Sequence, residues 1–280
     1  MNLQEIFLVE STEEDRELIT LSSSIIKKLK KYKGEKKGLG DFGQDSDFDD
    51  LDVPDGAYTD ELEDEPVKVG TIGTLCNTFL DTLENVVVEV QSDYGMKNRH
   101  AKARGSQSIS DDDESLGTYY PDENTIVINS DHLGKSYMDM VVAHELRHAL
   151  DDQKSGGKAL SSTKYRRARN PKLRKSTKDP YYGDQSYMAE PAEINARFIQ
   201  VLHNMVSIIK RHFSKKDIDV EKTKRTIMTN FYGQMEKHDI SVYFPEKERS
   251  KQYRRLLKRG VDFIQKEIAH QQKINQNKSI

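Results

Sequence analysis

The sequence predicts an α+β protein, in which a small β-sheet or hairpin precedes a central helix and a helical C-terminal part. Two patterns lead to this prediction. Short β-branched runs lie before residue 130, and apolar residues recur at helical spacing after it. The two patterns follow one another instead of alternating. Strands first and helices afterwards are typical of α+β folds rather than of alternating α/β folds.

The first predicted element is a helix over residues 12–33. Ser11 and Glu14 have the spacing of a capping box. Apolar residues then recur at helical intervals, and five lysines crowd the C-terminal end, where cations suit the helix dipole. The apolar positions are Leu18, Leu21, Ile25, Ile26 and Leu29.

An acidic segment separates this helix from the rest of the chain. Between residues 38 and 67 there are twelve Asp or Glu and no Lys or Arg. Such a block of like charge is typical of a linker or an interaction segment. We therefore predict a boundary near Pro66, with an N-terminal helix plus acidic linker over residues 1–66 and the main domain over residues 67–280.

The strands are predicted from β-branched and aromatic runs. Residues 67–69 and 86–90 are expected as strands, and residues 70–83 between them as more helical than extended. Residues 91–114 are polar and are expected to be irregular. Residues 117–120 and 125–129 flank a Pro-Asp-Glu-Asn turn, so they predict a β-hairpin.

Four helices are predicted after the hairpin. Residues 136–152 give the clearest pattern, with apolar residues on one stripe. Pro191 suits the first turn of a long amphipathic helix that runs to about Phe213. Apolar spacing predicts two more helices, over residues 218–237 and 246–272.

Composition excludes several classes of protein. Cys76 is the only cysteine among 280 residues, which rules out an internal disulfide and a cysteine-type zinc finger. No apolar run approaches the roughly 20 residues of a membrane span. The N-terminal residues lack the basic region of a secretion signal. We therefore expect a cytoplasmic protein without a membrane partner.

The chemistry is concentrated in His144-Glu145-Leu146-Arg147-His148, within the predicted helix 136–152. Residues four apart lie on one helical face, so both imidazoles can bind one zinc ion, Zn2+. Glu145 is displaced around the helix and suits a general base that deprotonates a metal-activated water. A catalytic zinc site needs a third protein ligand, and residues 187–198 are the obvious source.

These residues carry a resemblance to a known family. HELRHALDD at 144–152, followed by YMAEPAEINARF at 187–198, resembles the HExxH-plus-Glu, gluzincin-like metallopeptidases, and more narrowly the predicted peptidases of tailed phages. The resemblance covers roughly residues 117–205. It implies a zincin-like fold, a zinc metallopeptidase acting on protein or peptide substrates, and Glu193 as third ligand. It also implies a phage-encoded protein of the host cytoplasm or the virion, with phage structural proteins as candidate partners.

Several site assignments stay open at this point. Glu190 and Asp179 are alternatives to Glu193 as third ligand. Tyr187 is the preferred oxyanion donor, with Tyr182 as its alternative. Thermolysin-like enzymes have an aspartate four residues after the glutamate ligand, and here that position is Arg197. Asp151 or Asp152 could instead orient a zinc-binding histidine.

Two other classes of function compete with the peptidase. One is a virion-associated or binding protein with a structural or vestigial metal site, which a fourth protein ligand would close. The other is a nucleic-acid-associated protein that uses the basic loop 154–178. Residues 153–178 contain ten Lys or Arg and no Asp or Glu. A solvated loop explains that segment more simply, so nucleic acid is not the expected partner.

Overall fold

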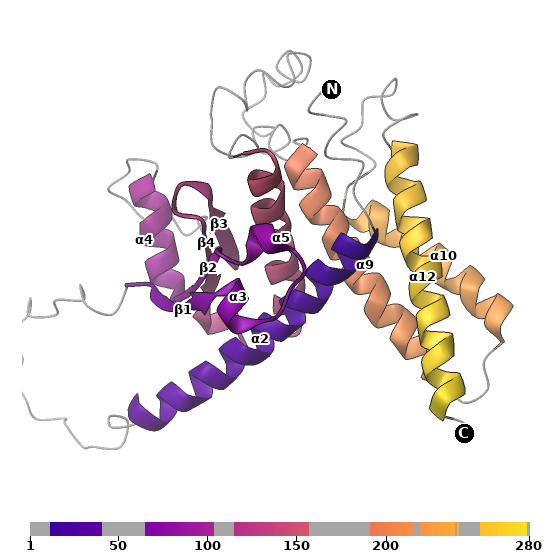
Figure 1. The fold of residues 1–280 in the computed structure, drawn as a ribbon, viewed down its shortest axis with the longest axis horizontal. Helices are drawn as coiled ribbons and strands as arrows, with labels where there is room; N and C mark the ends of the chain where they lie inside the picture. Colours follow the sequence, from indigo (N-terminus) through magenta and orange to yellow (C-terminus); the bar gives the residue numbers. More distant parts are fainter. Residues whose placement is uncertain are drawn as a thin grey trace, which may run out of the picture. The chain divides into compact units, whose positions relative to one another are not determined.

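A computed structural model describes residues 12–40, 65–103, 115–156, 191–214, 219–238, 240 and 253–278 (Figure 1). The protein is α+β, with a small mixed four-stranded sheet and several helices. The chain divides into two compact units, one of residues 21–142 and one of residues 1–20 with 143–280. Helices α2 (Thr12–Gly40) and α5 (Met138–Lys154) each contribute to both units. The boundary proposed near Pro66 adjoins residues 41–64, outside the described residues, and stays a prediction.

The sheet belongs to unit 21–142 and has the order β1-β2-β4-β3. Its strands are β1 (Val67–Thr71), β2 (Val87–Gln91), β3 (Gly117–Tyr120) and β4 (Thr125–Asn129). The predicted hairpin is confirmed, because β3 and β4 pair antiparallel with Thr118 opposite Val127. Strand β2 instead runs parallel to β4. Central strand β4 is buried along its whole length, which explains its nearly continuous apolar sequence.

Helix α4 (Asp93–Ala103) lies in a segment that the sequence predicted to be irregular, so that prediction is wrong. Its side chains form no strong apolar stripe, and tertiary contacts fix its first turn instead. The Asp93 N–H donates to Asp131 Oδ2 at 3.1 Å, and Arg99 Nη1 pairs with Glu89 Oε2 of β2 at 3.2 Å. The predicted helix 70–83 forms only α3 (Ile72–Leu75) and a short 3₁₀ turn, Asp81–Leu83.

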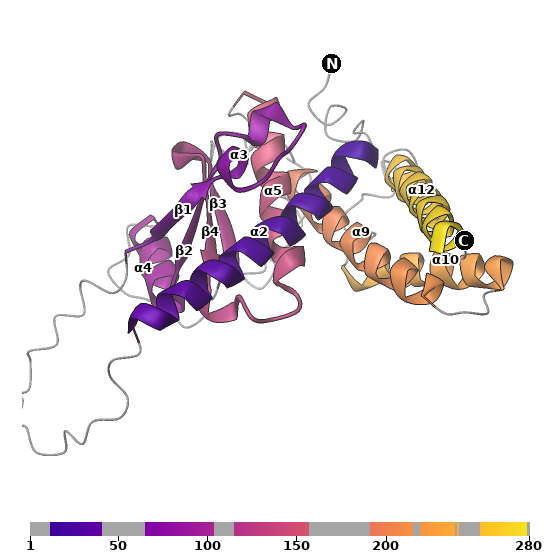
Figure 2. The same ribbon diagram turned by 60° about the horizontal axis from the view of Figure 1, so that its bottom comes forward.

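The other unit is helical. It contains the start of α2, most of α5, α9 (Pro191–Phe213), α10 (Val220–Lys237) and α12 (Arg254–Lys278). Helix α9 packs against both α10 and α12 (Figure 2). Phe198 and Phe231 are fully buried, and both rings approach Gly260 of α12. Gly260 allows the close approach, since a Cβ there would lie 2.3 Å from the Phe231 ring.

The predicted long helix with Pro191 in its first turn is confirmed and spans Pro191–Phe213, and the one predicted at 218–237 begins two residues later. The last helix runs to Lys278 rather than 272. Its predicted start at 246 lies outside the described residues. Among the helices that the structure describes, we find none with both the length and the apolar character needed to cross a bilayer.

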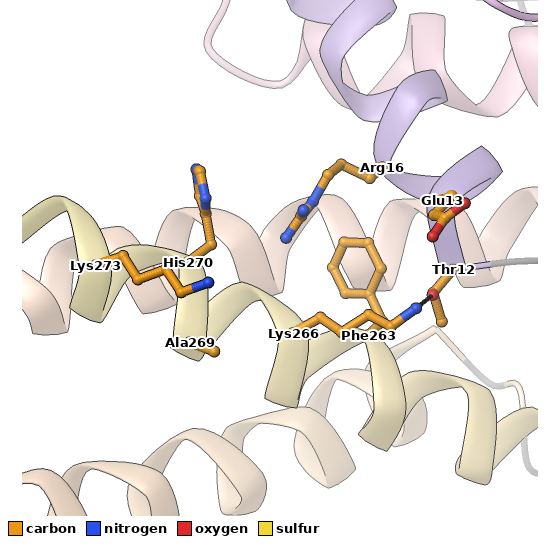
Figure 3. Close-up of a pocket in the computed structure, with 8 residues that line it drawn as sticks. All are labelled: Thr12, Glu13, Arg16, Phe263, Lys266, Ala269, His270 and Lys273. Carbon is orange, nitrogen blue, oxygen red and sulfur yellow. Dashed lines mark hydrogen bonds between the residues drawn. The ribbon is translucent and has the colours of Figure 1, made fainter.

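A cleft of about 320 Å³ lies where the first turn of α2 meets α12 (Figure 3). The Phe263 ring faces this cleft, and Lys266 Nζ crosses it to donate to Thr12 Oγ1 at 2.6 Å. Nearby, Arg16 Nη2 donates to Glu267 Oε2 at 2.8 Å. Glu13 and His270 stand at opposite ends of the cleft (Figure 3), so it offers no convergent ligand set. Its contacts join the first described helix to the last.

Candidate metal centre

Helix α5 places two imidazoles side by side. His144 and His148 are one turn apart, and their ring centroids are 4.6 Å apart with an interplanar angle of 80°. The two Nε2 atoms are 3.0 Å apart. Buried Leu146 and Leu150 anchor other positions of the same helix in the core. The apolar pattern that predicted the helix therefore fixes the direction in which both rings point.

The first turn of α9 brings a carboxylate to the same point. Glu193 Oε2 lies 3.3 Å from His148 Nε2 and 3.6 Å from His144 Nε2. The Glu193 side chain is 5% exposed. Within the described part of the chain, these three residues form the one group of three or more His, Cys, Asp or Glu whose ligand atoms converge.

The electrostatics of this group favour a bound cation. Burial raises the pKa of Glu193, but contact with the His144 and His148 rings has the larger, opposite effect. The net pKa is well below its ordinary value, so the group is ionised. Burial lowers the pKa of His148, but the Glu193, Glu145 and Asp151 carboxylates raise it above its ordinary value. Glu193 Oε2 accepts no hydrogen bond of normal geometry from any described residue. A metal ion would satisfy this buried oxygen.

Arg197 orients the glutamate. Its Nε donates to Glu193 Oε1 at 2.9 Å, from one helical turn further along α9. This contact holds Oε1 on the Arg197 side and leaves Oε2 towards the imidazoles. Arg197 occupies the position at which thermolysin-like enzymes carry an aspartate. In this chain the residue at that position contacts the carboxylate ligand.

Glu145 is buried next to the two histidines, with 7% of its surface exposed. Its charge is among the causes that raise the pKa of His148. It is not part of the converging ligand group. A carboxylate beside the ligands, but outside their group, suits proton transfer better than metal binding.

A second set of buried charges lies on the same helix. Asp151 Oδ1 accepts from Arg147 Nη2 at 2.5 Å, and its Oδ2 accepts from Asn195 Nδ2 at 3.3 Å. Arg147 Nη1 lies 3.8 Å from Asp15 Oδ1. Arg259 of α12 binds both oxygens of Asp15 with Nε and Nη2. We call Asp15, Arg147, Asp151 and Arg259 the buried charge chain.

The four charges of the buried charge chain balance one another in the interior. Burial raises the pKa of Asp15, although Arg259 opposes the shift. Burial also lowers the pKa of Arg147 to about 10, against the opposing effect of Asp151. All four side chains are at most 6% exposed. Two acids and two bases neutralise one another, so the buried charge chain needs no further ion.

The remaining candidates from the sequence have different outcomes. Glu190, Asp179, Tyr187 and Tyr182 lie outside the described residues, as does most of the basic loop 154–178. Asp151 contacts Arg147 and Asn195, and it makes no hydrogen bond to the His148 ring. Asp152 is buried at the end of the same helix. The motifs assigned no role to Arg147, Asn195, Asp15 or Arg259.

No protein-family model, curated protein or solved structure matches this chain. The resemblance to gluzincin-like peptidases therefore stays a prediction from the motifs at residues 144–152 and 187–198. The feature of the structure that points to a function is the convergence of His144, His148 and Glu193.

Proposed function

We propose that the protein is a zinc-dependent metallopeptidase of the gluzincin type, with a zincin-like fold and a phage origin. In this proposal His144, His148 and Glu193 hold the zinc ion, and Glu145 is the general base. Protein or peptide substrates in the host cytoplasm follow from the same proposal. The observation that carries it is the convergence of three ligand atoms, at separations of 3.0, 3.3 and 3.6 Å.

These separations fit the expected metal. Zinc–ligand bonds of about 2.0–2.1 Å in a tetrahedron put neighbouring ligand atoms roughly 3.3 Å apart. Two imidazoles with one carboxylate form a donor set typical of catalytic zinc, whereas magnesium and calcium prefer oxygen ligands. Among the described residues the converging group contains three ligands. A catalytic zinc site has three protein ligands and an open position, so this number favours a catalytic role over a structural one.

The chain's own residues supply the remaining chemistry. When bound, zinc supplies a Lewis acid that makes a neighbouring water more acidic. Glu145 then accepts a proton from the attacking water and returns it to the leaving amine. Arg197 keeps Glu193 in its ligand orientation. Tyr187 is proposed as the oxyanion donor from the sequence alone.

The first test is metal content and peptidase activity. Protein purified without chelators should contain about one zinc per chain, and EDTA should abolish hydrolysis of an unstructured protein substrate such as casein. Glu145→Gln should keep its zinc and lose activity by about 100-fold or more, since general base catalysis contributes roughly that factor. His148→Ala should lose the zinc.

His203→Ala provides the matched control. His203 is a half-buried histidine on α9 that lies outside the ligand group. Its variant should keep both zinc and activity. Wild-type protein without zinc would overturn the proposal. Zinc-loaded protein in which Glu145→Gln is as active as wild type would overturn the general base role.

A further inference from the structure

We propose that Asp151 and Asn195 are positioning residues, which hold helices α5 and α9 at the separation that the metal centre needs. This inference rests on the proposed function, because it assumes that a metal binds His144, His148 and Glu193. It concerns side chains that do not reach the metal. The sequence suggested Asp151 only as a residue that orients a histidine, and it assigned no role to Asn195.

The contact between them lies beside the ligands on both helices. Asp151 follows His148 by three residues on α5, and Asn195 follows Glu193 by two residues on α9. Asn195 Nδ2 donates to Asp151 Oδ2 at 3.3 Å, and both side chains are fully buried. This hydrogen bond therefore joins the two ligand-bearing helices directly next to the ligands, without involving a ligand atom.

The Asp151 carboxylate is itself held from the other side. Arg147 Nη2 binds its Oδ1 at 2.5 Å, and Arg147 also lies near Asp15, which Arg259 of α12 binds through two nitrogens. The acceptor that Asn195 meets is thus fixed by the buried charge chain. A fixed acceptor restricts the position of Asn195, and through it the first turn of α9.

The metal centre needs such a constraint because its ligands come from two helices. A metal site holds its ion tightly only if the ligands are kept within about 0.5 Å of the productive geometry. The partners that surround a metal's ligands typically contribute about 10–100-fold to metal affinity. The hydrogen bond between Asn195 and Asp151 joins α9 to α5 beside the ligands.

The test compares two asparagines on one helix. Asn195→Leu keeps the size of the side chain and removes the donor. Asn204→Leu removes a comparable bond, in which Asn204 Nδ2 donates to Gln234 Oε1 of α10 at 3.1 Å. We measure zinc affinity by competition with a chromophoric chelator, and ligand geometry from the visible absorption of the Co2+-substituted protein. Asn195→Leu should bind zinc about 10–100-fold more weakly than wild type and change the Co2+ spectrum. Asn204→Leu should alter neither.

A double-mutant cycle locates the effect. If the two residues act through their shared bond, Asn195→Leu should cost little further affinity in an Asp151→Ala background, which lacks the acceptor. Should Asn195→Leu fail to fold, Asn195→Ser replaces it in the same measurements. Wild-type affinity and spectrum in the Asn195 variant would overturn the inference, as would equal losses in the Asn195 and Asn204 variants. Wild-type protein that binds no zinc would instead overturn the proposed function.

Discussion

Helix α5 takes part in two buried clusters of ionisable side chains that differ in how their charges are satisfied. In the buried charge chain, each carboxylate meets at least one guanidinium within 2.7 Å, as in Arg147 with Asp151 and Arg259 with Asp15. In the metal centre, His144, His148 and Glu193 each present one ligand atom to the same point. Arg197 also contacts this group, and its Nε donates to Glu193 Oε1, the oxygen that does not face the imidazoles.

The difference separates a structural cluster from a candidate metal site. Buried charges that pair completely stabilise the fold only modestly, yet removing one partner is costly. A buried cluster of acceptors is costly until a cation or protons occupy it. Burial and charge alone therefore do not identify the site. Among the described residues, what identifies the site is the convergence of three ligand atoms on one point.

The largest effect should follow from breaking the buried charge chain. Arg259→Met leaves the Asp15 carboxylate buried without its principal partner, which typically costs about 3–5 kcal/mol of unfolding free energy. Urea denaturation measures this loss. The double variant Asp15→Leu with Arg259→Met removes both charges and should recover most of the stability. A double variant no more stable than Arg259→Met would contradict the assignment of these residues as a pair.

A smaller effect is expected from the cation at the metal centre. Arg197→Met frees Glu193 Oε1 and lets the carboxylate rotate, so zinc affinity should fall by about 10–100-fold. Unfolding free energy in EDTA should change far less than for Arg259→Met, because Arg197 is partly exposed. Lys210→Met, an exposed position on the same helix, is the control. Unchanged zinc affinity in Arg197→Met would show that Glu193 needs no such orientation.

The metal centre should make the stability of the protein depend on pH. In the metal-free protein, the raised pKa of His148 contributes stability below its ordinary value of 6.5, which is lost as pH rises through the raised pKa. The lowered pKa of Glu193 contributes stability above 4.5, which is lost as pH falls through the lowered pKa. The metal centre therefore favours folding most between pH 4.5 and 6.5.

Zinc should reverse part of this dependence, because it binds only deprotonated imidazole. We expect the metal-free protein to lose unfolding free energy as pH rises above 6.5, and zinc to stabilise the protein more at pH 8 than at pH 6. Urea denaturation with and without EDTA measures both. His148→Ala should remove the metal-free slope, and a slope of the opposite sign would refute the assignment.

The smallest effect should come from an exposed ion pair. Lys224 Nζ lies 2.9 Å from Glu221 Oε1 on α10, and both side chains are largely exposed. Glu221→Gln should change unfolding free energy by about 0.2–0.5 kcal/mol, since solvent screens such pairs. A loss that approaches that of Arg259→Met would show that burial is not what distinguishes the buried charge chain.

The spacing of apolar residues predicted the elements that bury an apolar stripe of their own. The hairpin β3–β4 and the helices α5, α9 and α10 are of this kind. It failed for α4, whose first turn depends on Asp131 from a distant part of the sequence. It also did not predict the parallel pairing of β2 with β4, because each strand's pattern reports its burial and not its neighbour.

The buried charge chain left a weaker signal in the sequence. Asp15 precedes Leu18, Ser22 and Ile25 at helical spacing, so it lies on the buried stripe of α2. Arg259 lies between Leu256 and Phe263 at helical spacing, so it lies on the buried stripe of α12. A charged residue on an apolar stripe predicts a buried partner. It does not predict which one, because the partners are 244 residues apart.

The sequence by itself determined the paired histidines and their neighbouring glutamate, since the rise of a helix fixes which residues share a face. It also determined most of the helices and the hairpin, because side-chain burial repeats with the period of the backbone. Only the tertiary structure decided that Glu193 meets these histidines, that Arg197 turns its carboxylate, and that Asp15 and Arg259 pair beneath them. Those contacts depend on how separate helices pack, and no local spacing encodes that arrangement.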